Sequence, residues 1–374
     1  MSDLIKLYVV TFFIILSSLF TCVVYRVSGD MNSFPALSNR AKVILVLAAF
    51  AITFTMLVLA TSAGVHKSIK RTVYFILMIF VFISLCFIFI NCLRPFGIRI
   101  NMFKATIYVA AFYACLYSYG YINRFIIRPT YYDIATEKNI NMKVAFVSDI
   151  HMGAIGTSAR LLKKIVNVIN ENKPDLVLFG GDIVESKLDY FNSSEYAEIL
   201  RGIKSRLGTK VILGNHEHYT GSLVKIMNFL TEKCGMHLLL DEFLEIDSSM
   251  ILIGRKDGGH NRTRIRKGLA DITKGINISN KFLLVLDHNP KYFDEVVASG
   301  VDLQLSGHTH NGQLFPFNLF IKFFYEKPYG KLVKQNSTLL VSSGAGTWGP
   351  PVKVFSKPEV VVVNINHIKK SKEN

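Results

Sequence analysis

The chain has 374 residues and a mass of 42.1 kDa; half of its residues are hydrophobic and 19% are charged. This length suffices for two or three domains, and the high apolar content excludes an intrinsically disordered chain. The formal net charge is +16, and residues 1–129 hold 12 Lys and Arg against 2 Asp and Glu. Because this positive charge accompanies long apolar runs, it favours anionic lipid headgroups over nucleic acid as a partner.

Four long apolar runs dominate the first third of the chain, at residues 4–24, 43–63, 73–93 and 105–121. Each is close to the roughly 20 residues that a helix needs to cross a bilayer. They predict an all-α region of four transmembrane helices over residues 1–129, and hence a multi-pass protein of the cell membrane with the lipid bilayer as a partner. Buried helices of a soluble core are an alternative, as is a cleaved signal peptide for the first run. The flanking basic residues number seven on one side and six on the other, which leaves the orientation open with a slight bias toward cytoplasmic tails.

After a predicted linker at residues 130–139, short apolar runs alternate with helical patterns. This alternation predicts an α/β domain over residues 140–368, followed by a charged tail at 369–374. Apolar side chains at positions 161, 162, 165, 166 and 169 predict an amphipathic helix over 159–170. The expected strands cover residues 144–148, 176–180, 210–213, 251–254, 282–286, 303–305, 338–341 and 360–364.

Side chains that can bind metal follow five of these strands. The segments that carry them are Asp149-Ile150-His151, Gly181-Asp182, Gly214-Asn215-His216-Glu217, Asp287-His288 and Gly307-His308-Thr309-His310. Taken singly, each segment also suits an ordinary turn at a strand end, with Asp287 as a helix cap. Taken together, they would gather at least seven oxygen and nitrogen donors and no cysteine at one edge of the sheets. Two divalent cations that share a carboxylate need such a set.

The ordered blocks D-x-H, G-D, G-N-H-E, a lone His and G-H-x-H resemble the signature of the calcineurin-like metallophosphoesterase superfamily. The resemblance implies a four-layer α/β/β/α sandwich and two divalent metal ions, with Mn, Fe and Zn all compatible with these ligands. It implies that His216 contacts the phosphoryl group and helps the leaving group to depart, and Glu217 is the residue expected to orient it. It also implies that one ion is held by Asp149, His151, Asp182 and His310, and the other by Asp182, Asn215, His288 and His308.

Residues 307–313 and 342–351, together with the apolar front of the chain, resemble the subgroup of transmembrane proteins with a metallophosphoesterase domain. Some members of that subgroup are linked to the hydrolysis of a diacylated UDP-glucosamine. The resemblance implies a membrane-anchored hydrolase of a phosphoester or pyrophosphate bond in a lipid-linked or membrane-proximal substrate. Two alternatives are a broad phosphodiesterase for small soluble phosphoesters and a non-catalytic, metal-bound membrane sensor.

Two further segments are expected to select the substrate. Arg262, Arg264 and Arg266 lie in a basic loop that could bind a phosphate, although a solvated loop has the same composition. Residues 314–325 carry nine large apolar side chains close after the last metal-binding block. This second segment either dips into a membrane interface near the site, with Phe315 to Tyr325 on the bilayer, or packs within the protein.

Overall fold

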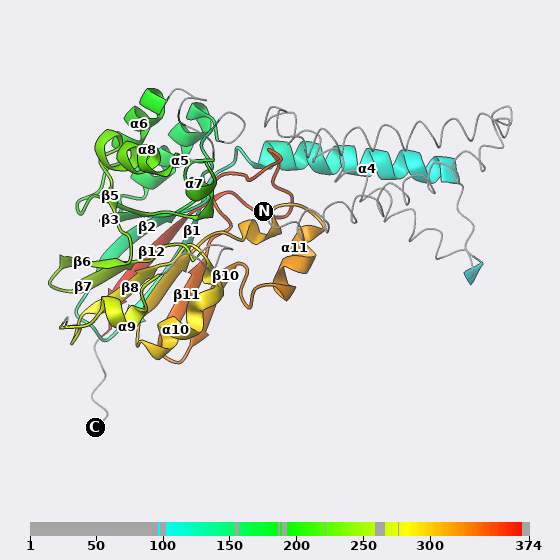
Figure 1. The fold of residues 1–374 in the computed structure, drawn as a ribbon. Helices are drawn as coiled ribbons and strands as arrows, with labels where there is room; N and C mark the ends of the chain where they lie inside the picture. Colours follow the sequence, from blue (N-terminus) through cyan, green and yellow to red (C-terminus); the bar gives the residue numbers. More distant parts are fainter. Residues whose placement is uncertain are drawn as a thin grey trace, which may run out of the picture. The chain divides into compact units, whose positions relative to one another are not determined.

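The computed structural model describes residues 96–97, 102–153, 157–185, 188, 193–220, 222–258, 266–275 and 277–368 (Figure 1). The chain divides into two units, Met1–Ser118 and Tyr119–Asn374. All the strands described below belong to the second unit.

Most of the predicted transmembrane region lies outside the described residues, including the spans expected at 4–24, 43–63 and 73–93. The span expected at 105–121 lies within helix α4 (Met102–Asn123). This helix contains five tyrosines, and their hydroxyl groups lower its hydropathy. In the part of the chain that the structure describes, no helix is both long enough and apolar enough to cross a bilayer. This finding contradicts the predicted multi-pass location in the cell membrane.

The first sheet has six strands in the order β1-β12-β2-β3-β4-β5. Their bounds are Arg128–Thr136 for β1, Glu359–His367 for β12, Met142–Val147 for β2, Leu176–Gly180 for β3, Thr209–Ile212 for β4 and His237–Leu238 for β5. Strands β2, β3, β4 and β5 run parallel to one another, whereas β12 is antiparallel to β2. The residues expected to form a linker, 130–139, include most of β1, which pairs with β12.

The second sheet also has six strands, in the order β10-β11-β9-β8-β7-β6. Their bounds are Gly330–Lys334 for β10, Ser337–Val341 for β11, Leu303–Ser306 for β9, Phe282–Leu286 for β8, Met250–Gly254 for β7 and Glu242–Asp247 for β6. The four central strands are parallel, and the two edge strands β10 and β6 are antiparallel to their neighbours.

The two sheets face each other across a shared apolar core. In β2, Val144 and Phe146 point into this core, whereas Ala145 and Val147 point to the opposite face of the first sheet. This alternation is the period of two that a strand imposes, and burial of both faces requires apolar residues at every position. Helices cover the two outer faces, so the domain has the α/β architecture with two sheets that the sequence predicts (Figure 1).

The helices of the first outer face are α5 (Ala159–Glu171), α6 (Ser193–Arg201), α8 (Leu223–Asn228) and the π-helix η3 (Phe229–Lys233). Those of the second outer face are α9 (Leu269–Ile272) and α10 (Phe293–Ala298), the latter preceded by the 3-10 turn η4 (Pro290–Tyr292). Helix α5 confirms the amphipathic helix predicted over 159–170: its five predicted apolar positions are buried, and Ser158 caps its first turn by accepting a hydrogen bond from the Leu161 N–H.

All eight strands predicted from apolar runs are present, within a few residues of their expected ends. Four further strands, β1, β5, β6 and β10, were not predicted. These four lie at the edges of the two sheets and have mostly exposed or half-buried residues. A strand with one open edge does not need a continuous apolar run, so the sequence carries little signal for it.

Candidate metal centre

The candidate metal centre lies where five strands end. Asp149 and His151 follow β2, Asp182 follows β3, and Asn215 begins the short helix α7 (Asn215–Tyr219) after β4. From the second sheet, His288 follows β8, while His308 and His310 follow β9, with His310 at the start of the 3-10 turn η5 (His310–Gly312). The carboxyl ends of parallel strands meet at one edge of each sheet, which is why segments far apart in the chain converge here.

Five of the seven predicted ligands have left-handed backbone conformations, with φ between 50° and 70°. They are Asp149, His151, Asp182, His308 and His310. This conformation costs roughly 1–2 kcal/mol for a residue other than glycine. It lets the chain turn sharply as each strand ends, so that Asp149, His151 and His310 meet in one cluster and Asp182 and His308 in another. Such strain is typical of a functional site.

Two glycines leave space for the carboxylates. A Cβ at Gly214 would overlap Asp182 Oδ1, and a Cβ at Gly307 would overlap Asp149 Oδ2. Backbone donors then hold the two carboxylates in place. The His216 N–H donates to Asp182 Oδ1 at 2.8 Å, and the His308 N–H donates to both oxygens of Asp149 at 3.1 Å. The glycines in the G-N-H and G-H-x-H blocks are therefore required by close packing against the neighbouring ligand.

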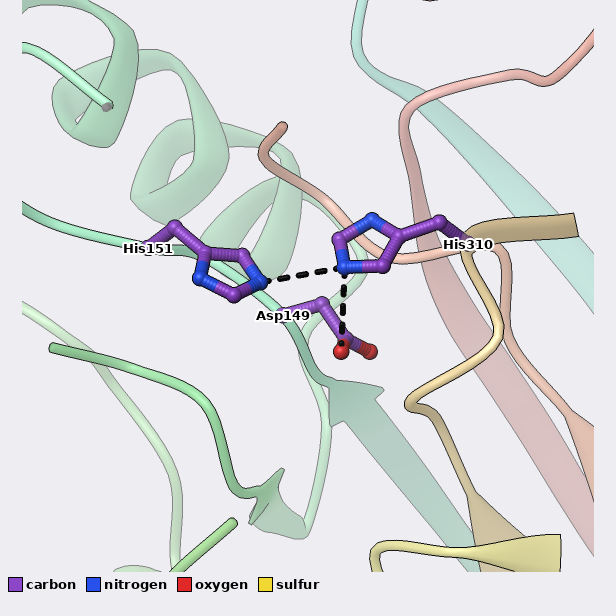
Figure 2. Close-up of side chains that lie close together, drawn as sticks. All are labelled: Asp149, His151 and His310. Atoms are coloured by element: carbon purple, nitrogen blue, oxygen red, sulfur yellow. Dashed lines mark hydrogen bonds and ion pairs between the residues drawn. The ribbon is translucent and has the colours of Figure 1, made fainter. Parts of the chain in front are cut away.

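The first cluster contains Asp149, His151 and His310 (Figure 2). His310 Nε2 lies 3.0 Å from His151 Nε2 and 3.4 Å from Asp149 Oδ1. All three residues are buried. Their ligand atoms point at a common position between the end of β2 and the turn after β9.

The second cluster contains Asp182, His288 and His308, and Asn215 lies among them. Asn215 Oδ1 is 3.2 Å from His288 Nε2 and 2.8 Å from His308 Nδ1. Asp182 Oδ2 is 3.1 Å from His288 Nε2 in this cluster and 3.9 Å from His151 Nε2 in the first. Asp182 therefore lies between the two clusters.

The hydrogen bonds behind the ligands test whether this set fits cations. His151 Nδ1 is 2.8 Å from the Glu185 carboxylate, and His288 Nδ1 is 2.7 Å from the Gly180 carbonyl oxygen. Because both oxygens accept hydrogen bonds, we assign a ring proton of each histidine to Nδ1, so that Nε2 is the atom that would bind a cation, in His288 after loss of its second proton. Lone pairs and carboxylate oxygens that converge in this way repel one another unless a cation lies among them. The residues therefore fit two divalent cations with nitrogen and oxygen ligands.

Electrostatics within the clusters are consistent with this fit. Burial acts to raise the pKa of Asp182, but His288, His216 and His151 hold it well below its ordinary value. Burial and the neighbouring His151 lower the pKa of His310 well below its ordinary value. Burial acts to lower the pKa of His288, yet Asp182 and Asp149 raise it well above the ordinary value. At neutral pH, Asp182 and His310 are thus already in the forms that bind a cation, and His288 would release a proton on binding.

His216 lies beside both clusters, with 16% of its side chain exposed. Its Nε2 is 4.0 Å from Asp182 Oδ2, and its Nδ1 is 2.7 Å from Glu185 Oε2. Burial acts to lower the pKa of His216, but the hydrogen bond to Glu185 and the charge of Asp182 raise it above the ordinary value. One carboxylate, Glu185, thus holds the Nδ1 atoms of both His151 and His216.

The expectation that Glu217 orients His216 is wrong. The Glu217 carboxylate is buried and instead accepts hydrogen bonds from four backbone N–H groups, those of Asp182, Ile183, Val184 and Gly214. Sequence reasoning missed Glu185 in this role, although it lies three residues after Asp182, in the turn that carries that ligand. Acidic residues in the turns after metal-binding strands are the signal that could have found it.

The predicted substrate arginines are only partly described. Arg262 and Arg264 lie outside the described residues. Arg266 makes two hydrogen bonds to the buried Asp287, at 3.3 and 2.6 Å, and its guanidinium lies 4.2 Å from the centre of the Tyr292 ring. Asp287 is therefore an internal ion-pair partner rather than the expected helix cap; Asn289 caps η4 by accepting a hydrogen bond from the Lys291 N–H.

The apolar segment after the last ligand forms α11 (Phe317–Phe320) and the 3-10 turn η6 (Ile321–Phe323). Leu314 is buried. Five other large side chains of the segment are exposed, namely Phe317, Leu319, Phe320, Phe323 and Phe324.

Known proteins resemble the chain over this same region. The family model for the calcineurin-like phosphoesterases matches residues 142–312. A metallophosphoesterase of Aquifex aeolicus is 32% identical over 255 residues, which make up 66% of this chain and 95% of the relative. The chain belongs to the calcineurin-like phosphoesterase family. Its relatives place it among metal-dependent phosphoester hydrolases, and its clustered His and Asp side chains are suited to a binuclear centre of divalent cations.

Two other relatives of this family member extend the comparison. A metallophosphoesterase of Campylobacter jejuni is 33% identical over 227 residues, which are 60% of this chain and 59% of the relative. A transmembrane protein with metallophosphoesterase domain from Danio rerio is 28% identical over 320 residues, which are 77% of this chain and 70% of that protein. The chain thus spans most of the Aquifex relative but about three fifths of the Campylobacter one.

Proposed function

We propose that this family member hydrolyses phosphoester bonds at two divalent cations held by the seven residues of the two clusters. One cation would bind Asp149, His151, Asp182 and His310, and the other Asp182, Asn215, His288 and His308. The observation that carries the proposal is the position of Asp182, whose Oδ2 lies 3.1 Å from His288 Nε2 and 3.9 Å from His151 Nε2. A carboxylate between two clusters of nitrogen donors is the arrangement that a shared ligand requires.

The bound cations would supply Lewis-acid activation of water and neutralise the charge on the phosphoryl oxygens. The protein's own contribution to proton transfer comes from His216. With Nδ1 held by Glu185, Nε2 faces the clusters, and the raised pKa keeps a proton available on this ring near neutral pH. His216 can therefore donate that proton to the oxygen of the departing group.

The proposal is tested with the full chain by hydrolysis of bis-p-nitrophenyl phosphate after chelation and readdition of Mn²⁺. Asp182→Asn removes the shared negative charge, so this variant should lose bound metal as well as turnover. His216→Ala leaves every proposed ligand in place, so it should retain metal while turnover falls roughly 100-fold or more. Metal content per chain, measured by mass spectrometry of the dialysed protein, separates the two effects.

Lys291→Ala serves as a control, because Lys291 is exposed and its ammonium lies over the Tyr325 ring, 5.0 Å from the ring centre. It should bind metal and turn over substrate as the wild type does. A folded, metal-loaded wild type that hydrolyses none of the phosphoesters offered would refute the proposal and favour the non-catalytic sensor.

The natural substrate stays a prediction. A lipid-linked pyrophosphate similar to UDP-diacylglucosamine comes from the sequence resemblance, and the exposed apolar side chains of α11 and η6 support an apolar group in the substrate. Small soluble phosphodiesters are the second candidate. Contacts of Arg262 and Arg264 with a phosphate also stay a prediction. The guanidinium of Arg266 is paired with Asp287, which argues against a phosphate contact from Arg266.

A further inference from the structure

Two aromatic side chains lie against His216. The Tyr219 ring is 5.6 Å from the His216 ring between centres, and the Trp348 ring is 6.2 Å away, both edge to face. Each remains more than half exposed, at 56% for Tyr219 and 52% for Trp348. Two large aromatic surfaces beside His216, the residue that would protonate the departing group, are therefore exposed to a ligand.

The loop that carries Trp348 is held in place by one buried side chain. Gln313 Oε1 accepts a hydrogen bond from the Trp348 N–H at 2.8 Å, and Gln313 Nε2 donates to the Trp348 carbonyl oxygen at 2.7 Å. Gln313 itself has a positive φ of 48° and lies three residues after the ligand His310. A side-chain amide that satisfies both polar groups of one residue fixes that residue's backbone.

The same loop is also tied to the first cluster. The Gly346 N–H donates to the Asp149 carbonyl oxygen at 2.9 Å, and Ser356 Oγ donates to the His310 carbonyl oxygen at 2.7 Å. The indole is thus exposed on an anchored loop, with a defined position relative to His216. Gln313 and Trp348 both lie beyond residues 142–312, the part that matches the family model.

We propose that Trp348 is the wall of the leaving-group subsite and selects phosphoesters whose departing group carries a planar ring, with Gln313 as its positioning residue. The inference rests on the proposed function, because it takes His216 as the residue nearest the departing oxygen. A planar ring stacks on an indole with a geometry that a saturated ring of similar size cannot adopt. Either an aryl group or a nucleobase could supply this planar ring in the departing group.

The test uses two stable ligands of similar size, phenylphosphonate with a planar aromatic ring and cyclohexylphosphonate with a puckered saturated one, as inhibitors of bis-p-nitrophenyl phosphate hydrolysis by the full chain. The wild type should bind the phenyl compound more tightly. In Trp348→Leu, which keeps apolar bulk but removes the ring, the inhibition constant for phenylphosphonate should rise roughly tenfold, whereas that for cyclohexylphosphonate should change less than about twofold. Trp348→Phe should restore most of the preference.

Gln313→Ala should lower the phenyl preference in the same direction while Trp348 is still present. Phe243→Ala is the matched control, since Phe243 is an exposed aromatic residue on the edge strand β6, and it should change neither inhibition constant. An equal loss for both phosphonates in Trp348→Leu, or no change for either, would overturn the inference. Uridine monophosphate as a third inhibitor distinguishes a nucleobase from a simple aryl group.

Trp348 is the single tryptophan of the chain, so its fluorescence provides a readout independent of turnover. Phenylphosphonate should alter the emission of the metal-loaded wild type, and cyclohexylphosphonate should alter it less. Turnover with unchanged emission and unchanged selectivity would refute the inference but leave the proposed function standing. Absence of turnover in the metal-loaded protein would instead refute the proposed function, and the inference with it.

Discussion

At the scale of the residue, Glu185 shows how one carboxylate can serve two imidazoles with different tasks. Its Oε2 lies 2.8 Å from Nδ1 of His151, a proposed ligand, and 2.7 Å from Nδ1 of His216, the proposed acid. Glu185 is nearly buried, and burial acts to raise its pKa, yet the hydrogen bonds to the two histidines hold that pKa below its ordinary value. An ionised carboxylate here aims the Nε2 atoms of both rings into the site.

Replacing this carboxylate should move the pH dependence of the reaction. In Glu185→Gln the negative charge beside His216 is lost, so the pKa of His216 should fall from its raised value. A lower pKa means that the protonated ring disappears at lower pH, and the alkaline limb of the kcat profile should move toward acid. The measurement is kcat for bis-p-nitrophenyl phosphate against pH at saturating Mn²⁺.

Glu185→Asp, which keeps the charge, should leave this limb closer to its wild-type position. If the limb of Glu185→Gln coincided with that of the wild type while kcat fell, Glu185 would act on the reaction through the metal site alone.

At the scale of the elements, the turns after β3 and β4 are joined by Glu217. This side chain accepts hydrogen bonds from the N–H groups of Gly214, Asp182, Ile183 and Val184 at 2.6–3.1 Å. The turns that carry Asp182 and Asn215 are thus held together by a fully buried carboxylate. Because a buried N–H without a partner costs about 1–3 kcal/mol, this contact has a large share in the stability of the strand ends.

Glu217→Gln should therefore destabilise the domain strongly. An amide offers one acceptor oxygen where the carboxylate offers two, so at least one N–H would lose its partner and another would face the NH₂ group. The free energy of unfolding, measured in urea on the metal-free protein, should fall by roughly 3 kcal/mol. Glu232→Gln, a change at an exposed position, should alter it by less than about 0.5 kcal/mol. Equal stability of the two variants would show that the four N–H groups find other partners.

At the scale of the whole molecule, three apolar layers hold the catalytic unit together, one between the sheets and one under each set of helices. The layer beneath α5, α6 and α8 includes Cys234, which is 5% exposed. Burial raises the pKa of the Cys234 thiol to about 12. The reactive thiolate is therefore scarce as long as this layer stays closed.

Labelling by iodoacetamide at pH 8 should distinguish an exposed cysteine from the buried Cys234. Cys115 is exposed and should react in native buffer, whereas Cys234 should react only as urea unfolds the domain. Peptide mass spectrometry reports each site separately. Labelling of Cys234 at the rate of Cys115 in native buffer would show that the layer under the first helical face opens without global unfolding.

The sequence by itself determined the α/β class, the eight central strands and the set of residues that converge in the metal centre. These features are local: a buried strand needs a continuous apolar run, and a ligand at its end follows within a few residues. The edge strands escaped this reasoning because their exposed residues carry no such run. Within the described residues, the span predicted at 105–121 was wrong because apolar length alone did not account for the tyrosines of α4.

Only the tertiary structure decided which acidic residue holds His216, where Arg266 is bound and which aromatic ring borders the site. Glu185 and Glu217 both lie near the ligands in the chain, and the direction of each side chain in its turn separates their roles. Trp348 reaches His216 across 132 residues because Gln313 and the backbone at Asp149 hold its loop. Such contacts depend on long-range packing, for which a single sequence has no local pattern.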